Sequence, residues 1–145
     1  MERQPEPPRY FTLEQANRLL PRVQRLLEQL QAQASELAMV QQVLAEGVGA
    51  AGAARGPGSN GHAGNGAAQR YLGALQRVDA VLDAMRVPLA ELQQIGCELK
   101  DIQTGLVDFR TVRDGRAVYL CWRLGEDEIR FWHELDTGFA GRQPL

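Results

Sequence analysis

The chain has 145 residues, and its 16 basic and 18 acidic side chains give a formal net charge of −2. A chain of this length suits one domain with a modest core. The charges are evenly spread, with nine acids and nine bases in residues 1–96, so no basic patch is left to neutralise a phosphate backbone and we expect no nucleic acid among the partners.

The N-terminal sequence and the cysteine count bear on where the protein works. "MERQPEPPRYFTLEQ" lacks the apolar core of a signal peptide, and no stretch of the chain is apolar enough to span a membrane. Two cysteines without a secretion signal favour free thiols in a reducing compartment. We therefore expect a soluble, cytoplasmic protein with no membrane partner.

The first predicted element is a helix over residues 12–45. Thr12 is suited to cap it, because its hydroxyl can accept the backbone N–H of Gln15 while the Gln15 side chain reaches back to the cap. Apolar side chains then recur at alternating spacings of three and four, which is the heptad pattern of a helix that packs on another helix. They are Leu13, Ala16, Leu20, Val23, Leu27, Leu30, Ala34, Leu37 and Leu44, with Gln41 at one position of the series.

A glycine-rich segment separates this helix from a second one. Residues 47–66 contain eight glycines among 20 residues, so we expect a flexible Gly/Ala-rich linker over residues 46–69, with His62 exposed and without a role. A second helix over residues 70–95 repeats the heptad pattern. Two such helices most simply form an antiparallel hairpin. The expected seam of the second helix is Tyr71, Leu75, Val78, Leu82, Met85, Leu89 and Leu92.

The apolar period changes from 3.6 to 2 in a β-rich unit over residues 96–145. "LVDFRTV" and "AVYLCW" flank "RDGR", and Asp-Gly between two alternating runs indicates a hairpin with a two-residue turn. This turn predicts an apolar face with the opposite pairs Thr111–Val118, Phe109–Leu120 and Val107–Trp122. It predicts a mixed face with the pairs Val112–Ala117, Arg110–Tyr119 and Asp108–Cys121.

A third strand is expected at "EIRFWHEL", residues 128–135, with a helix that starts at the acidic "EDE" as the alternative. In the register that we expect, His133 lies opposite Val118, on the apolar face and away from Cys121 and Asp108. A slip of one residue would reverse this placement. The register therefore decides whether the histidine shares a site with the cysteine and the aspartate.

Several side chains of the β-rich unit are of types that bind metals. They are Asp108, Cys121, His133, Glu134 and Asp136. Their spacing matches no C-x-x-C, H-E-x-x-H or H-x-H motif, so the sequence predicts no specific metal site and identifies no cofactor. A histidine in such a sheet is typically a satisfied, half-buried side chain. A cysteine between Leu120 and a tryptophan is typically a small packing residue, since thiol catalysis needs a lowered pKa and a base.

Three further residues are candidates for ligand binding. Trp122 and Trp132 are typical of a core, and they are alternatively a stacking wall for a ligand. Arg142 ends the loop "GFAGR", where two glycines indicate a tight turn. Its guanidinium can bind a carboxylate or phosphate of a ligand, or it can fix the C-terminal tail to the sheet through Asp136 or Glu134.

Four segments resemble one known family. "YFTLEQANRLLP", "GCELKDIQTGLVDF", "DGRAVYLCWRLGEDEIRFWHE" and "GFAGR" are similar to a prokaryotic family, domain of unknown function 2203. The resemblance covers residues 10–30 and 95–142, and the glycine-rich linker looks like an insertion. It implies a small bacterial or archaeal cytoplasmic protein, but no activity, substrate or catalytic residue. It adds Arg116 and Glu126 to the candidates, among residues it implies are shared: Asp108, Gly115, Arg116, Cys121, Trp122, Gly125, Glu126, Trp132, His133, Gly138, Phe139 and Arg142.

These patterns predict an α+β fold in a single domain, residues 1–145. A long antiparallel helical hairpin is followed by a small antiparallel β-meander of two to three strands. The heptad seam favours a non-enzymatic protein that associates with itself or with a partner helix. The alternative is a metal- or small-ligand-binding protein, possibly an enzyme, that uses the mixed face of the sheet and the "GFAGR" loop.

Overall fold

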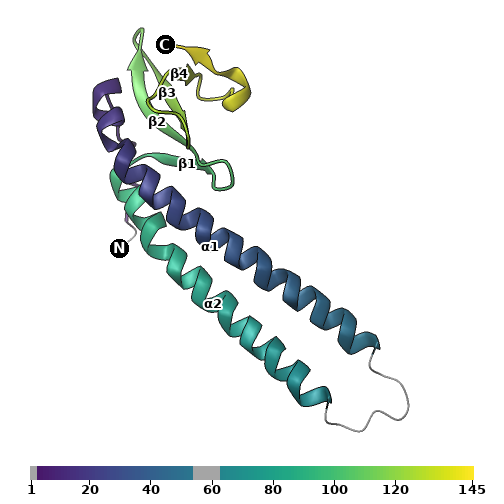
Figure 1. The fold of residues 1–145 in the computed structure, drawn as a ribbon. Coiled ribbons are helices and arrows are strands. Elements are labelled where there is room, and N and C mark those ends of the chain that lie inside the picture. Colours follow the sequence, from purple (N-terminus) through teal and green to yellow (C-terminus); the bar gives the residue numbers. More distant parts are fainter. Residues whose placement is uncertain (1–2, 54–62) are drawn as a thin grey trace. The chain divides into compact units, whose positions relative to one another are not determined.

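The computed structural model describes residues 3–53 and 63–145. Two long helices precede an antiparallel sheet (Figure 1), which confirms the α+β class and gives five strands instead of two to three. The elements are α1 (Leu13–Ala53), α2 (Ala63–Ile95), β1 (Glu98–Asp101), β2 (Leu106–Arg113), β3 (Arg116–Arg123), β4 (Phe131–His133), the single-turn 3-10 helix η1 (Phe139–Gly141) and β5 (Gln143–Pro144).

Both helices extend further into the glycine-rich segment than we expected. α1 continues to Ala53 and α2 begins at Ala63, so much of the expected linker 46–69 is helical. The alanines interspersed with the glycines have the highest helix propensity and offset the cost of glycine. The expectation for His62 concerns a residue outside the described part of the chain. None of the helices described is long and apolar enough to cross a membrane.

The chain divides into two compact units. The first, here called the sheet unit, comprises Met1–Gln31 and Pro88–Leu145. The second, here called the hairpin unit, comprises Ala32–Val87 and therefore consists of the C-terminal part of α1 and most of α2.

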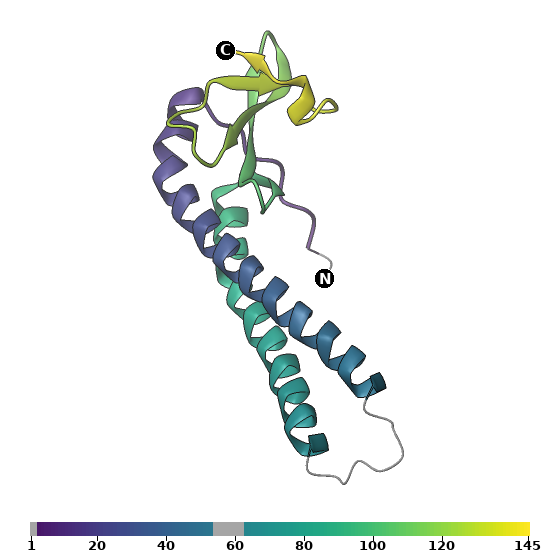
Figure 2. The ribbon, with the colours of Figure 1, turned by 45° about the vertical axis from the view of Figure 1, so that its right-hand side comes forward.

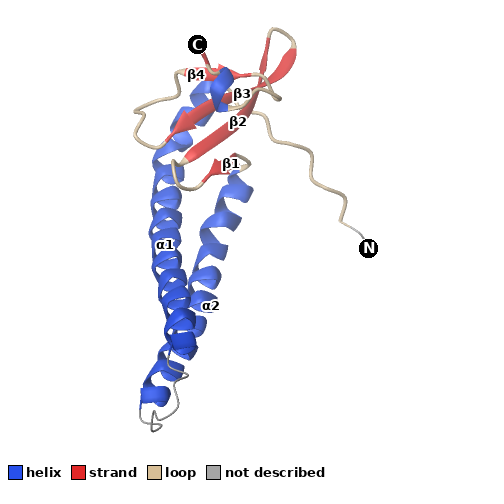
Figure 3. Cartoon of the chain, turned by 90° about the vertical axis from the view of Figure 1, so that its right-hand side faces the viewer, coloured by secondary structure: helices blue, strands red, loops and turns tan. Residues whose placement is uncertain are grey.

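The strands of the sheet unit follow one another in the order β1-β2-β3-β4-β5, each antiparallel to the next (Figure 3). The β2–β3 register confirms every pair predicted from "RDGR". Asp114 has φ 51° and Gly115 has φ 78°. Two successive positive φ values are the geometry of a type I′ turn, whose twist matches that of the strands it joins.

The core of the sheet unit lies on the apolar face predicted for the hairpin. Phe11 precedes the helix cap and packs edge-to-face on Phe109 at 5.4 Å between ring centroids, and its backbone N–H donates to the carbonyl of Arg110 at 2.7 Å. The capping box forms as expected between Thr12 and Gln15. The other buried residues of this core are Ala16, Leu20, Val23, Leu26, Leu27 and Leu30 of α1, Leu92 and Ile95 of α2, and Val107, Val118, Leu120, Trp122, Ile129 and Trp132.

The register of β4 is not the one we expected. His133 pairs with Tyr119 instead of Val118, and Phe131 pairs with Cys121. The strand is shifted by one residue, so His133 lies on the mixed face of the sheet, with Cys121 and Asp108, and the expectation that they lie apart is wrong. Residues 128–135 are also not a helix, since β4 occupies Phe131–His133.

The shift has a physical cause in the residues between β3 and β4. Ile129 leaves the strand ladder and is buried in the core, where its backbone N–H donates to the Asn17 side chain at 2.9 Å. Glu126 holds the preceding turn, because its carboxylate accepts the backbone N–H of Arg123 at 2.7 Å and its carbonyl accepts the Trp122 indole N–H at 2.9 Å. Burial of the isoleucine thus takes precedence over continuation of the strand.

Candidate functional site

Three polar or thiol side chains are buried side by side on the mixed face of the sheet. Asp108 comes from β2, Cys121 from β3 and His133 from β4. Asp108 lies opposite Cys121 in the ladder, and His133 is displaced by one pleat, because it lies opposite Tyr119. The relative exposures of the three are 2%, 0% and 2%.

The three side chains are close enough to bind one ion together. Their ligand atoms, which are a carboxylate oxygen of Asp108, Sγ of Cys121 and a ring nitrogen of His133, all lie within 4.8 Å of one another. Such a group of an oxygen, a sulfur and a nitrogen donor is typical of sites for zinc and related metals. Among the residues described, this cluster is therefore a candidate metal site.

The hydrogen bonds of His133 show which of its ring nitrogens is a donor. Its Nδ1 is 2.7 Å from the carbonyl oxygen of Glu134, which can only accept, so Nδ1 carries a hydrogen and donates. Its Nε2 is 3.0 Å from Oδ2 of Asp108. One proton occupies this second contact, either on the ring or on the carboxyl group. In both cases the buried pair has no net charge, which limits the cost of its burial.

Cys121 is a protonated thiol at neutral pH in this environment. Burial and the negative charge of Asp108 raise the pKa of its thiol to about 12, against an opposing effect of the Arg142 guanidinium. The other carboxylate oxygen of Asp108, Oδ1, is buried and has no hydrogen-bond partner among the described residues. A buried carboxylate oxygen without a partner is costly, and a ligand at this position would satisfy it.

Arg142 covers the cluster from the C-terminal segment, which Figure 2 shows beside the sheet, in yellow. Its guanidinium donates to the Glu126 carboxylate at 2.6 Å and to the backbone carbonyl of Cys121 at 3.2 Å. It also lies over the rings of Phe131 and Phe139, at 4.3 and 4.7 Å from their centroids. Of the two roles expected for Arg142, the geometry therefore favours fixing the tail, with Glu126 as the partner instead of Asp136 or Glu134.

The other side of the cluster is closed by a polar network that the sequence did not indicate. The Tyr119 hydroxyl donates to Glu98 at 3.0 Å and accepts from Arg110 at 3.1 Å. Burial and the hydrogen bond to Glu98 raise the pKa of this tyrosine. Glu98 belongs to β1 and lies opposite Asp108 in the sheet. The signal that was missed is the two-residue alternation of "ELKD".

The remaining candidates lie elsewhere. Arg116 forms a two-pronged ion pair with the Glu134 side chain at the surface. Trp122 is on the apolar face, in the core. Trp132 is on the same face, but it lines a surface hollow that Trp122 does not reach. The two tryptophans therefore do not form one stacking wall for a ligand.

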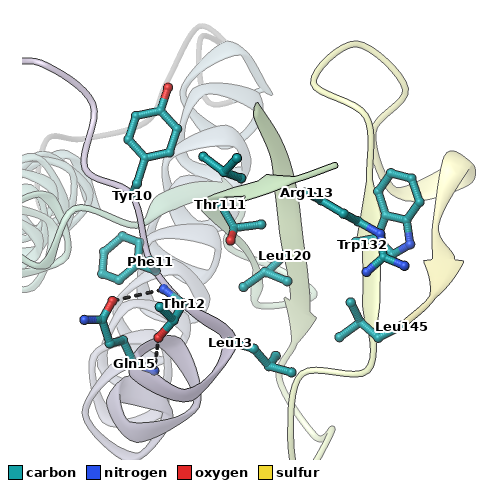
Figure 4. Close-up of a pocket in the computed structure, with 11 residues that line it drawn as sticks. Tyr10, Phe11, Thr12, Leu13, Gln15, Thr111, Arg113, Leu120, Trp132 and Leu145 are labelled. Carbon is teal, nitrogen blue, oxygen red and sulfur yellow. Dashed lines mark hydrogen bonds between the residues drawn. The ribbon is translucent and has the colours of Figure 1, made fainter. Parts of the chain in front are cut away.

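That hollow has a volume of about 500 Å³ and lies beside the N-terminus of α1 (Figure 4). Trp132 borders it, with the Arg113 guanidinium 4.8 Å from the ring centroid. The capping hydrogen bonds of Thr12 and Gln15 border it on the helix side. Its lining is mostly apolar and includes none of Asp108, Cys121 and His133. The full lining is Tyr10, Phe11, Thr12, Leu13, Gln15, Thr111, Val112, Arg113, Leu120, Trp132 and Leu145.

The geometry of the cluster does not fit thiol catalysis. A nucleophilic cysteine needs a base that takes its proton and a depressed thiol pKa. Here both ring nitrogens of His133 are engaged, with Glu134 and Asp108, and the pKa of Cys121 is raised. The arrangement fits metal ligation better, because a divalent ion stabilises the thiolate that burial otherwise disfavours.

Comparison with known proteins places the chain in a family but gives no activity. The model of the family DUF2203, described as an uncharacterised conserved protein, matches residues 9–145. The match spans nearly the whole chain and includes the glycine-rich segment. No curated protein and no solved structure matches.

Proposed function

This chain belongs to the DUF2203 family, and we propose that it binds one divalent transition-metal ion, such as Zn²⁺, between Asp108, Cys121 and His133. The observation that carries the proposal is the convergence of three different ligand types, from three neighbouring strands, within 4.8 Å in a buried place. Carboxylate, thiolate and imidazole together suit zinc and its neighbours in the first transition series, whereas Mg²⁺ and Ca²⁺ prefer oxygen ligands alone.

Charge balance supports a divalent ion. Without metal, the Asp108–His133 pair is neutral and the Cys121 thiol is neutral, so the cluster has no net charge. With metal, a carboxylate and a thiolate cancel the two positive charges, and the imidazole remains neutral. The buried cluster is thus neutral in both states, which avoids the large cost of an isolated buried charge.

The hydrogen bond of His133 Nδ1 also supports ligation. A metal-bound histidine usually donates its other ring N–H to a carbonyl or carboxylate, which fixes the ring and its tautomer. The Glu134 carbonyl already has this position, at 2.7 Å from Nδ1. Nε2 is thereby directed to the cluster, where a metal would replace the proton that it shares with Asp108.

A binding role is favoured over a catalytic one. The three ligand residues are at most 2% exposed, and Arg142 is held over them by Glu126. A substrate has no route to a bound ion in this conformation, although three protein ligands leave one coordination position for a small molecule. We therefore propose a metal-binding protein in which the ion stabilises the sheet or is stored.

The direct test is titration of the metal-free protein with Co²⁺, a spectroscopic substitute for zinc. We expect one equivalent to bind, with a thiolate-to-cobalt absorption band in the near ultraviolet. Cys121→Ser should abolish that band, and Cys97→Ser, which alters the other buried free cysteine, should leave it unchanged. Because binding displaces the proton of the Asp108–His133 pair and the thiol proton, we expect two protons to be released per ion, measurable with a pH indicator in weak buffer.

Asp108→Asn separates binding from folding. The amide can donate to Nε2 of His133 and preserve the buried hydrogen bond, but it is a poor metal ligand. We expect a folded variant, by circular dichroism and thermal unfolding, whose affinity for Co²⁺ falls by at least about tenfold, in the range seen when supporting residues of metal sites are changed. Stoichiometric binding that is unaffected in both Asp108→Asn and Cys121→Ser would refute the proposed site.

We further propose that the protein works in the cytoplasm. Both cysteines are free and buried, and a site with a thiolate ligand requires a compartment in which that thiol stays reduced. Fractionation of cells that produce the protein from its own promoter would test this location. Recovery in an extracellular or periplasmic fraction would contradict it.

A further inference from the structure

We propose that the hairpin unit, Ala32–Val87, binds a second copy of itself, with the two hairpins parallel and related by a two-fold axis along the helices. This inference is independent of the metal site. It rests on an apolar groove between α1 and α2 within the unit and on the charges along its two rims.

The groove has an exposed apolar floor. Its volume is about 550 Å³. Met39 and Val43 of α1 are 69% and 49% exposed, and Ala74 of α2 lies between the helices. Large apolar side chains at such exposure in adjacent turns are a mark of surfaces that bind other proteins. The floor by itself, however, does not say which partner covers it.

The rims of the groove identify the partner. The α1 rim carries two acids, Glu36 and Glu46, and the α2 rim carries two bases, Arg70 and Arg77. Glu36 and Arg77 form an ion pair across one end of the groove. At the other end, Gly47 of α1 lies next to Tyr71 of α2, because a Cβ at Gly47 would be 3.9 Å from the tyrosine ring. Glu46 and Arg70, which precede these two residues, are therefore at about the same height along the hairpin.

The rims are therefore self-complementary in one orientation only. In a dimer with its two-fold axis parallel to the helices, the two grooves face each other. The acidic rim of each copy then lies on the basic rim of the other. If the axis instead runs across the helices, acids face acids and bases face bases, which is repulsive. A two-fold arrangement that repeats the same contacts twice is the common form of a homodimer.

The helices also suit this arrangement. Ten residues separate the two acids and seven separate the two bases, or roughly 15 Å and 10 Å along helices that rise about 1.5 Å per residue. The mismatch is within the reach of arginine side chains. In the parallel dimer each α1 lies against the α2 of the other copy and runs antiparallel to it, as neighbouring helices do in a four-helix bundle.

The first experiment measures the mass of the full-length protein by sedimentation equilibrium over a range of micromolar concentrations. We expect a monomer–dimer equilibrium. Met39→Glu places a charge on the groove floor and should weaken the dimer by at least about tenfold, which corresponds to about 1.4 kcal/mol. Leu72→Glu is the matched control, because Leu72 is 58% exposed on α2 but does not line the groove. A monomer throughout, or equal effects of both variants, would overturn the proposal.

The second experiment tests the orientation by exchanging charges on the rims. Glu46→Arg and Arg70→Glu should each weaken the dimer, since each places like charges against each other in two symmetric places. The double variant should restore it, because the exchanged rims are again complementary. Failure of the double variant to recover would refute the parallel two-fold arrangement. Since no variant lies in the sheet unit, Co²⁺ binding serves as the check that each protein is intact, and loss of the dimer with Co²⁺ binding retained separates the two proposals.

Discussion

Asp108 and His133 lie on strands β2 and β4, which are separated by β3, and yet they are joined by a buried hydrogen bond of 3.0 Å. Cys121 lies on the intervening strand, opposite Asp108, and we infer that its small side chain leaves room for the imidazole to reach the carboxylate. The cysteine is fully buried and adds a third ligand type to the pair.

The second cysteine gives a pH prediction at the scale of one residue. Cys97 is buried, its thiol is 3.6 Å from the Leu92 carbonyl, and burial raises its pKa from 9.0 to about 12. Between these two values the unfolded chain loses the thiol proton and the folded chain keeps it, so the unfolded state binds fewer protons and stability falls as pH rises. Below about pH 9 this contribution is complete, and it is lost as pH rises toward 12.

Urea unfolding at several alkaline pH values measures this effect, and Cys97→Ala is the comparison. Other groups titrate in the same range, but they are common to both proteins. We expect the free energy of unfolding of the wild type to fall more steeply with pH than that of Cys97→Ala. Parallel curves for the two proteins would show that the thiol of Cys97 ionises equally in the folded and unfolded states, contrary to the structure.

Among the elements of the fold, the β2–β3 hairpin was the most predictable and β4 the least. The Asp114–Gly115 pair fixes the hairpin register locally, because both residues accept positive φ and the turn leaves one possible pairing. The loop before β4 has no such signal. Its course depends on burial of Ile129 against α1, which is a tertiary effect, and the location of His133 in the candidate site depends on that course.

The seam of α2 was also ambiguous for a physical reason. Tyr71, Leu75, Leu82 and Leu89 were expected to be buried and are 39–49% exposed. A second series with the same spacings of three and four, shifted around the helix, includes Ala74 and Val81, and these are buried. Val78 and Met85 belong to both series. Periodicity alone cannot distinguish two overlapping seams on one helix. The buried seam is the one with the smaller side chains, Ala74 and Val81, which allow the helices to approach more closely.

The contact between the β1–β2 loop and the β3–β4 loop gives a prediction at the scale of elements. Gly105 precedes β2 with φ +70°, and its carbonyl accepts the Leu124 backbone N–H at 2.9 Å. A Cβ at this glycine would lie 2.5 Å from Cβ of Leu124. Gly105→Ala therefore adds a clash with the Leu124 side chain to the strain of a positive φ, and we expect it to destabilise the protein by about 2–4 kcal/mol.

Gly115→Ala is the matched comparison for that prediction. Its φ is +78°, but nothing lies within 4 Å of the added Cβ, so only the left-handed conformation is penalised, by about 1–2 kcal/mol. Urea denaturation of both variants measures the difference. If Gly115→Ala were as destabilising as Gly105→Ala, the contact of the added Cβ with Leu124 would have no measurable cost, contrary to this prediction.

For the molecule as a whole, the two units differ in how much apolar surface they bury. Most of the buried core belongs to the sheet unit, whereas Ala74 and Val81 are the buried apolar residues described in the hairpin unit. Since local opening is easiest where few apolar side chains are buried, the hairpin unit should open without unfolding of the sheet unit. This contrast predicts a specific pattern of amide hydrogen exchange.

We expect the slowest exchange in β2 and β3 and in α1 up to Gln31, and faster exchange in α1 from Ala32 onward and in α2 up to Val87. If it binds at the proposed site, Co²⁺ should slow exchange in β2, β3 and β4, each of which contributes one of the three ligand residues, and should leave the helices of the hairpin unit unchanged. A higher protein concentration should slow exchange in the hairpin unit and leave the sheet unit unchanged, because the proposed dimer buries the groove of the hairpin unit. Mass spectrometry of peptides from the exchanged protein distinguishes these responses. Uniform exchange in both units, with a single response to metal and to concentration, would mean that the chain opens only as one cooperative body.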